Sequence, residues 1–217
     1  NFGKRSLEIL KLLKEIPYLS IRINKLTYSE KEFLEFAKRE NITIMNKVED
    51  IYYISKTVIN TPEFVEGKII IQDGSSYLAA KTLGAKEGET ILDACSAPGS
   101  KALVMAQEMK NTGKIIALDI HEHKIELIKE NAKKMGITII ATENRDATKI
   151  HQSNEVFDRI LVDAPCTGFG VLRKKPEALY NKTQANIDEL AVLQYDVLTS
   201  AAKKLKIDKP VSSHIFR

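Results

Sequence analysis

Tryptophan is absent from this sequence of 217 residues, and cysteine, histidine and proline are scarce. Two cysteines do not make a disulfide framework, and both lie at predicted strand-end loops, so we expect a reducing, cytoplasmic location. No apolar run approaches the roughly 18 residues of a membrane-spanning helix. We expect no metal site, because His121 and His123 begin a helix without a third ligand nearby and the other two histidines are isolated.

Charged residues are common, and the positive excess is confined to one end of the chain. The net charge is +4, and residues 171–217 hold nine Lys or Arg against five Asp or Glu, which accounts for all of it. Such a placement fits a polyanionic partner. For Arg173, Lys174 and Lys175 we favour this interpretation over a solvated face. For Lys203, Lys204 and Lys206 a solvated helix face is equally consistent with the pattern.

Three apolar segments each end in an aspartate, at Asp93, Asp119 and Asp163. The carboxyl ends of parallel strands meet at one edge of a sheet, which is where α/β folds bind ligands. The first segment continues into a turn of small residues and a helix start, whose free N–H groups favour a nucleoside-bearing cofactor. Asp119 lies twenty residues after Gly99, where an acidic side chain accepts hydrogen bonds from ribose hydroxyls. Asp119 could also cap the next helix, and the two roles can coexist.

The order of predicted elements divides the chain near residue 60. Residues 1–60 read as a small α+β unit with helices over 6–16 and 29–40 and strands over 19–23 and 51–54; a capping-box pattern starts the second helix. Residues 61–217 alternate between strand and helix, which predicts a mostly parallel sheet. The strands are expected at 69–72, 91–94, 115–119, 138–141 and 159–163, and the helices at 76–83, 101–109, 122–135 and 185–204.

The segment from Asp93 to Lys101, Asp-Ala-Cys-Ser-Ala-Pro-Gly-Ser-Lys, resembles the cofactor motif of the RsmB/Sun family of RNA cytosine-C5 methyltransferases. Asp163-Ala-Pro-Cys-Thr-Gly168 resembles that family's second motif, and residues 72–80 and 20–24 are similar to its upstream segments. The resemblance implies a class I methyltransferase (Rossmann-like) fold, S-adenosylmethionine as cofactor and RNA, expected to be ribosomal, as partner. It implies that Asp119 holds the ribose, Asp146 lies by the adenine and Asp163 lies near the methyl-transfer centre. The methionine part would be wrapped by Cys95, Ser96, Ala97, Pro98, Gly99, Ser100 and Lys101.

The sequence departs from the family pattern in two places. Ser96 and Ser100 replace small residues of the cofactor motif, and Ser100 is expected to weaken cofactor binding, since glycine there allows close backbone approach. The family follows its next helix with a buried strand and a Thr-Cys motif whose cysteine attacks the base, and no Thr-Cys is present here. We therefore expect a C-terminally truncated methyltransferase domain with an incomplete sheet and impaired turnover.

A missing strand would have a structural consequence. It would leave residues 159–162 as an edge strand with unpaired backbone groups and would favour self-association. Residues 211–216 or another chain could instead cover that edge.

Cys166 and Asp163 are the predicted catalytic residues. Carbon 5 of cytosine becomes nucleophilic only after a thiolate adds to carbon 6. The resemblance implies that Cys166 assists product release, whereas in DNA cytosine-C5 methyltransferases the cysteine of the corresponding loop is the attacker. An unreactive buried thiol is the third interpretation.

Two other functions are compatible with parts of the sequence. A catalytically silent remnant that binds RNA or cofactor would explain the missing Thr-Cys. A nicotinamide-dependent dehydrogenase would share the sheet class, but G-x-G-x-x-G is absent. The turn before Lys101 also lacks the G-x-x-x-x-G-K-[ST] spacing of a nucleotide-triphosphate loop.

Overall fold

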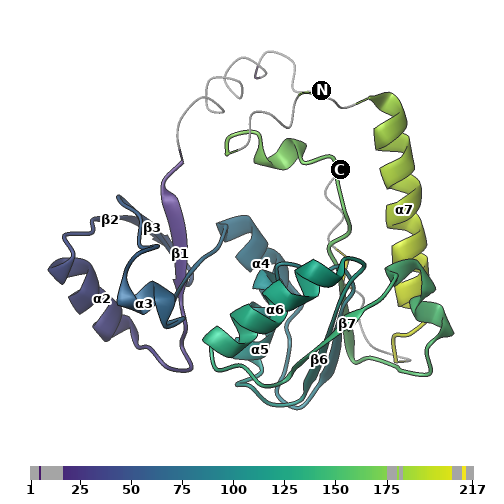
Figure 1. Cartoon of the computed structure of the whole chain (residues 1–217), viewed down its shortest axis with the longest axis horizontal. Helices are drawn as coiled ribbons and strands as arrows, with labels where there is room; N and C mark the ends of the chain where they lie inside the picture. The colour runs from purple at the N-terminus through teal and green to yellow at the C-terminus, as the bar shows by residue number, and fades with distance from the viewer. Residues whose placement is uncertain (1–4, 6–16, 175–179, 181–182, 207–211, 214–217) are drawn as a thin grey trace.

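The computed structural model describes residue 5, residues 17–174, residue 180, residues 183–206 and residues 212–213. Within this part the chain forms two sheets, one antiparallel and one parallel. In Figure 1 the antiparallel sheet with α2 and α3 lies at one end of the molecule and α7 at the other, with the parallel sheet and its helices between them. The helix predicted over 6–16 lies outside the described residues.

The N-terminal unit is a four-stranded antiparallel sheet with two helices. Its strand order is β2-β3-β1-β4, and the bounds are β1 Leu19–Ile23, β2 Ile44–Val48, β3 Ile51–Ile54 and β4 Ile69–Ile71. Helix α2 (Glu30–Arg39) begins at the predicted capping box of Ser29 and Glu32. Its aromatic side chains Phe33 and Phe36 are buried against this sheet. Strand β2 and helix α3 (Pro62–Val65) were not predicted.

One predicted strand belongs to the other sheet. Residues 69–72 were expected to start the parallel sheet, but β4 pairs antiparallel with β1, with Ile21 opposite Ile71 and Ile23 opposite Ile69. A run of three isoleucines has no alternation that could assign it to one sheet, whereas burial of Ile69 in the N-terminal core decides the pairing. The antiparallel sheet therefore extends past residue 60.

The second sheet confirms the predicted Rossmann-like class I methyltransferase architecture. Its five strands are all parallel in the order β7-β6-β5-β8-β9. The strands are β5 Thr90–Asp93, β6 Lys114–Asp119, β7 Ile140–Asn144, β8 Arg159–Val162 and β9 Ser212–Ser213. The helices are α4 Gly74–Thr82, α5 Ser100–Glu108, α6 Glu122–Lys134 and α7 Gln184–Ala202, with short 3₁₀ helices η2 Ala147–Gln152 and η3 Phe169–Val171.

Helices cover both faces of this sheet, as a parallel sheet requires. Successive residues of β5 point to opposite faces, so that Ile91 packs with α4 and α5 whereas Leu92 packs with α7 and η2. None of the described helices combines the length and the apolar composition needed to cross a membrane.

The expectation that β8 is an open edge strand is wrong. Strand β9 pairs with it in parallel, with Leu161 opposite Ser212 and Val162 opposite Ser213. The segment after α7 is brought alongside by the Phe157 amide, which donates to the carbonyl of Lys204 at 2.8 Å. At Leu161 and Val162 this pairing occupies the edge that would otherwise be open. The covering segment falls within the tail that the sequence offered as one solution, and self-association stays a prediction.

Candidate functional site

The structure brings the three predicted strand-end carboxylates to one edge of the parallel sheet. Asp93 ends β5 and Asp119 ends β6, and Asp163 follows the last residue of β8. Strand β5 lies between β6 and β8, and Asp93 is in register with Ala117 on one side and Leu161 on the other. In open α/β sheets the carboxyl edge beside the first strand is the usual ligand site.

The loop after β5 is held against its neighbours by backbone hydrogen bonds. The Ser96 amide donates to the carbonyl of Leu118 at 2.7 Å, and the Gly99 amide donates to the carbonyl of Ser96 at 2.7 Å. Gly99 has φ of +95°, and a Cβ at this position would lie 3.1 Å from a methyl group of Ile128 on α6. Both the backbone conformation and the close approach to α6 therefore require glycine.

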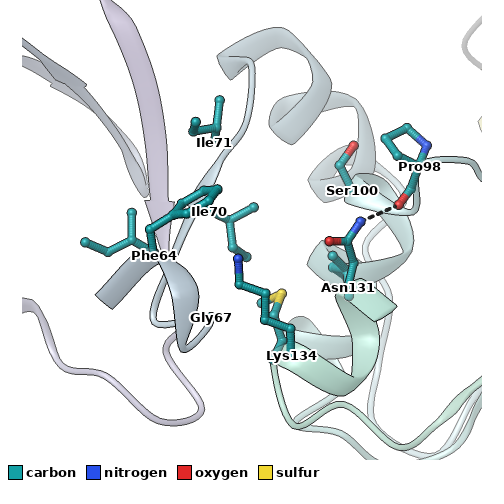
Figure 2. Close-up of a pocket in the computed structure, with 11 residues that line it drawn as sticks. Phe64, Gly67, Ile70, Ile71, Pro98, Ser100, Asn131 and Lys134 are labelled. Carbon is teal, nitrogen blue, oxygen red and sulfur yellow. Dashed lines mark hydrogen bonds between the residues drawn. The ribbon is translucent and has the colours of Figure 1, made fainter. Parts of the chain in front are cut away.

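Helix α5 begins in this loop without a side-chain cap. Gly99 occupies the N-cap position and supplies no side-chain acceptor. The first amide groups of the helix and its positive dipole end are therefore available to an anionic group of a ligand. Asn131 of α6 donates to the carbonyl of Pro98 at 3.1 Å and fixes the back of the loop (Figure 2).

Asp93 is the most unusual ionisable group of the described residues. It is 1% exposed, and neither its carboxyl oxygens nor the Ser96 hydroxyl has a hydrogen-bond partner within the described chain. Burial raises the pKa of Asp93 to about 7, against the nearby Ser96 side chain and the charge of Lys101, which lower it. Buried polar groups are nearly always paired, so this arrangement fits a ligand that brings a donor, above all a cationic one.

Asp163 forms an ion pair that crosses the site. Its Oδ2 lies 2.5 Å from Nζ of Lys101, and the two side chains are 27% and 16% exposed. Lys101 lies in the first turn of α5, so the pair connects the start of this helix to the end of β8. A partly buried ammonium–carboxylate pair can orient a polar substrate group and neutralise charge that develops near it.

One carboxylate oxygen of Asp119 caps the next helix, and the other is free to bind a ligand. Its Oδ1 accepts a hydrogen bond from the amide of His121, the N-cap of α6, at 2.9 Å. The other carboxylate oxygen has no partner among the described residues. Ile120 beside it is 60% exposed. Our sequence reasoning missed Ile120, although its place directly after a strand-end carboxylate was visible.

Asp146 is also held in a capping interaction. Its Oδ1 accepts from the amide and hydroxyl of Thr148 at 2.9 and 2.7 Å, at the start of η2. These hydrogen bonds lower the pKa of Asp146. The Arg145 amide donates to the carbonyl of Asp119 at 3.1 Å, so the Asp146 loop is joined to the end of β6.

The two cysteines differ in environment. Cys95 is partly buried, and burial, together with the nearby carboxylates, raises the pKa of its thiol to about 12. This thiol is protonated at neutral pH and is a poor nucleophile. Cys166 is exposed, and its loop is held to α7 by Gln194, whose amide donates to the carbonyl of Pro165 at 2.8 Å.

The basic segment after Cys166 is tied to the N-terminal side of the molecule. Lys174 forms an ion pair with Asp73, which caps α4. Although burial opposes it, the interactions with Lys174 and Ser75 lower the pKa of Asp73 to about 2. Arg173 is exposed on the same turn, and Lys175 lies outside the described residues. Nothing in the sequence pointed to Asp73 as a partner of Lys174.

No group of three metal-ligating side chains occurs within the part of the chain that the structure describes.

Comparisons with known proteins agree with this geometry. The family model described as 16S rRNA methyltransferase RsmB/F matches residues 80–211. The probable ribosomal RNA small subunit methyltransferase B of Bacillus subtilis is 43% identical over 195 residues, which are 88% of this chain and 44% of that protein. The human 28S rRNA (cytosine(4447)-C(5))-methyltransferase is 38% identical over 151 residues, 70% of this chain and 19% of that one.

A solved structure gives the same result for the fold. The methyltransferase homologue from Pyrococcus horikoshii superposes with a TM-score of 0.85 at 26% identity, covering 97% of this chain and 68% of the other. The chain spans less than half of the length of both curated relatives. On the family match and the shared fold, the chain belongs to the RsmB/F family of 16S rRNA methyltransferases.

Proposed function

We propose that this chain binds S-adenosylmethionine at the carboxyl edge of its parallel sheet and serves methylation of carbon 5 of cytosine in ribosomal RNA. The observation that supports this best is that two buried groups, the Asp93 carboxyl and the Ser96 hydroxyl, have no hydrogen-bond partner within the described chain. Both groups lie near the start of α5, which has no side-chain cap. A cofactor that carries both an ammonium and a carboxylate group complements these neighbours.

Each part of the cofactor has a matching group in the chain. S-adenosylmethionine supplies a methyl group on a sulfonium centre. The first turn of α5 and the loop from Cys95 to Lys101 would hold the methionine carboxylate, and Asp93 its ammonium. The free oxygen of Asp119 would accept hydrogen bonds from the ribose, and Ile120 would cover the adenine together with the loop of Asp146.

The catalytic residues would be Asp163 and Cys166. Asp163, oriented by Lys101 at 2.5 Å, would hold the polar edge of the flipped cytosine. Cys166 is an exposed thiol three residues further on, where it can reach a bound base either to attack carbon 6 or to assist release. Because the 217 residues contain no Thr-Cys pair, we expect these residues alone to bind cofactor and to transfer methyl groups slowly.

The RNA would reach this edge along the basic segment with Arg173, Lys174 and Lys175. Lys174 would exchange its Asp73 partner for a phosphate. Both side chains of that pair are more than two-fifths exposed, and such pairs contribute only about 0–1 kcal/mol. A polyanion can displace them, because phosphate neutralisation dominates RNA affinity.

For these 217 residues taken alone, which contain no Thr-Cys pair, a catalytically silent module that binds RNA or cofactor is the second candidate. The family match argues against the dehydrogenase interpretation. Both cysteines are free thiols, in keeping with the cytoplasmic location that we propose.

Methyl transfer from labelled S-adenosylmethionine to ribosomal RNA transcripts tests the proposal. We expect cofactor binding and slow incorporation at cytosine carbon 5. Binding without any incorporation would favour the silent module, and rapid incorporation abolished by Cys166→Ala would show that Cys166 is the attacker. A chain that binds neither cofactor nor RNA would contradict the proposal.

A further inference from the structure

Strand β1 presents buried polar side chains to the methyltransferase unit. Arg22 of this mostly apolar strand is 2% exposed, and Asn24, which directly follows the strand, is 1% exposed. The guanidinium Nε of Arg22 donates to Oε1 of Gln72 at 2.7 Å. Oδ1 of Asn24 accepts from Nε2 of Gln107, near the end of α5, at 2.6 Å. Burying such groups is costly unless each has a defined partner.

Gln72 continues the first of these contacts to the cofactor loop. It is 3% exposed, and its amide Nε2 donates to the carbonyl of Ser100 at 3.3 Å. Ser100 is the first residue of α5 and directly follows Gly99. The backbone amide of Gln72 also donates to the carbonyl of Ser20 at 3.1 Å. A continuous path of hydrogen bonds therefore joins β1 to the first turn of α5, the helix that follows the loop after β5.

The chemistry of Arg22 fixes the direction of this path. A guanidinium group only donates hydrogen bonds, so the oxygen of the Gln72 amide must face Arg22 and its nitrogen must face Ser100. Burial lowers the pKa of Arg22 to about 10, which leaves the group charged at neutral pH. The amide of Gln72 therefore cannot rotate by half a turn without losing both interactions.

Packing beside this path is incomplete. A cavity of about 150 Å³ is bordered by Ile70 and Ile71 on the N-terminal side and by Pro98 and Ser100 on the other (Figure 2). The hydrogen bond from Gln72 to the Ser100 carbonyl, beside this cavity, is therefore important for the position of Ser100.

We propose that Gln72 is a positioning residue that holds the first turn of α5 in place, so that the N-terminal sheet helps to set the affinity for the cofactor. This inference rests on the proposed function, since it presumes that the ligand of this turn is S-adenosylmethionine. In this role Gln72 would act through the carbonyl of Ser100 and not through contact with the cofactor.

Gln72→Glu tests the inference with almost no change in shape. A glutamate still accepts from Arg22, but it cannot donate to the Ser100 carbonyl and repels it. Loss of one such hydrogen bond predicts that the calorimetric Kd for S-adenosylmethionine rises about 5- to 20-fold. Amide hydrogen exchange in the first turn of α5 should also become faster in the cofactor-free protein.

Gln107→Glu is the matched control. It removes the equivalent donor to Asn24, seven residues and therefore about 10 Å further along the same helix. We expect a similar change in the thermal unfolding midpoint but less than about a twofold change in Kd.

The outcomes separate the two proposals. A Gln72→Glu protein with wild-type Kd and wild-type exchange, or equal weakening by both variants, would overturn the positioning role. If Gln72→Glu does not fold, Gln72→Met, which loses both side-chain hydrogen bonds without adding charge, takes its place under the same criteria. A wild-type chain that does not bind S-adenosylmethionine would instead contradict the proposed function, while hydrogen exchange would still report whether Gln72 holds α5.

Discussion

Each buried charged side chain of the N-terminal unit has at least one partner, whereas one buried carboxyl at the carboxyl edge of the parallel sheet, that of Asp93, has none within the described chain. In the first region Arg39 binds Glu63 at 2.6 Å and Lys47 binds Glu30 at 2.5 Å. In the second, Asp93 is buried and neither of its oxygens is bonded within the described chain. Paired charges need no ligand, whereas an unpaired buried carboxyl destabilises the folded state until a ligand supplies a partner. The difference identifies the ligand site better than the density of charge does.

Asp93→Asn should have the largest effect on cofactor binding. The change removes the charge that a cofactor ammonium would need, so we expect the affinity for S-adenosylmethionine to fall by about 100-fold. The free energy of unfolding of the cofactor-free chain should stay the same or rise at neutral pH. Calorimetry and thermal unfolding measure the two quantities. A variant that loses stability and keeps its affinity would show that Asp93 is a structural residue.

The pH dependence of stability should show the cost of burying the charged Asp93 carboxylate. Because the pKa of Asp93 is raised to about 7 in the folded chain, the folded state binds the proton more tightly than the unfolded one. This contribution is fully present at acid pH and is lost as the pH rises through 7. The free energy of unfolding should therefore fall by on the order of 3 kcal/mol more in the wild type than in Asp93→Asn between pH 5 and pH 8. Parallel pH curves would contradict this.

Asp119→Asn sharpens the comparison because it separates two roles of one side chain. Asparagine still accepts from the His121 amide, so stability should change by less than about 0.5 kcal/mol. The missing charge should lower the affinity for S-adenosylmethionine about tenfold. Equal affinities for wild type and variant, measured by calorimetry, would leave Asp119 with the capping role alone.

The smallest expected effect concerns the ion pair between Asp73 and Lys174. Asp73→Ser keeps an N-cap for α4 and releases Lys174, so RNA affinity should rise about two- to threefold with little change in stability. Lys174→Ala should weaken RNA binding and reduce the slope of log Kd against log salt concentration by about one. Filter binding at several salt concentrations measures both. Weaker binding by Asp73→Ser would argue that the pair positions the segment instead of competing with RNA.

The parts that could be predicted from the sequence are those with local causes. The capping box at Ser29 set the start of α2, and apolar runs that end in aspartate located β5, β6 and β8. Strand β2 escaped detection because it is largely exposed and lacks an apolar alternation. Strand β4 went to the other sheet because three isoleucines in a row do not choose between partners.

Features that depend on distant residues could not be predicted. The ion pair of Asp73 with Lys174 and the path from Arg22 through Gln72 to Ser100 join segments far apart in the chain. The strand-end position of Asp93 was visible in the sequence, whereas its lack of a partner follows only from the packing around it.

Calorimetric titration of the wild-type chain with S-adenosylmethionine at pH 7, in two buffers of different ionisation enthalpy, tests the central claim most directly. We expect one binding site and the release of about half a proton, because the ligand ammonium would lower the pKa of Asp93, so the heat should differ between buffers. No binding heat in either buffer, or binding with the same heat in both, would contradict it.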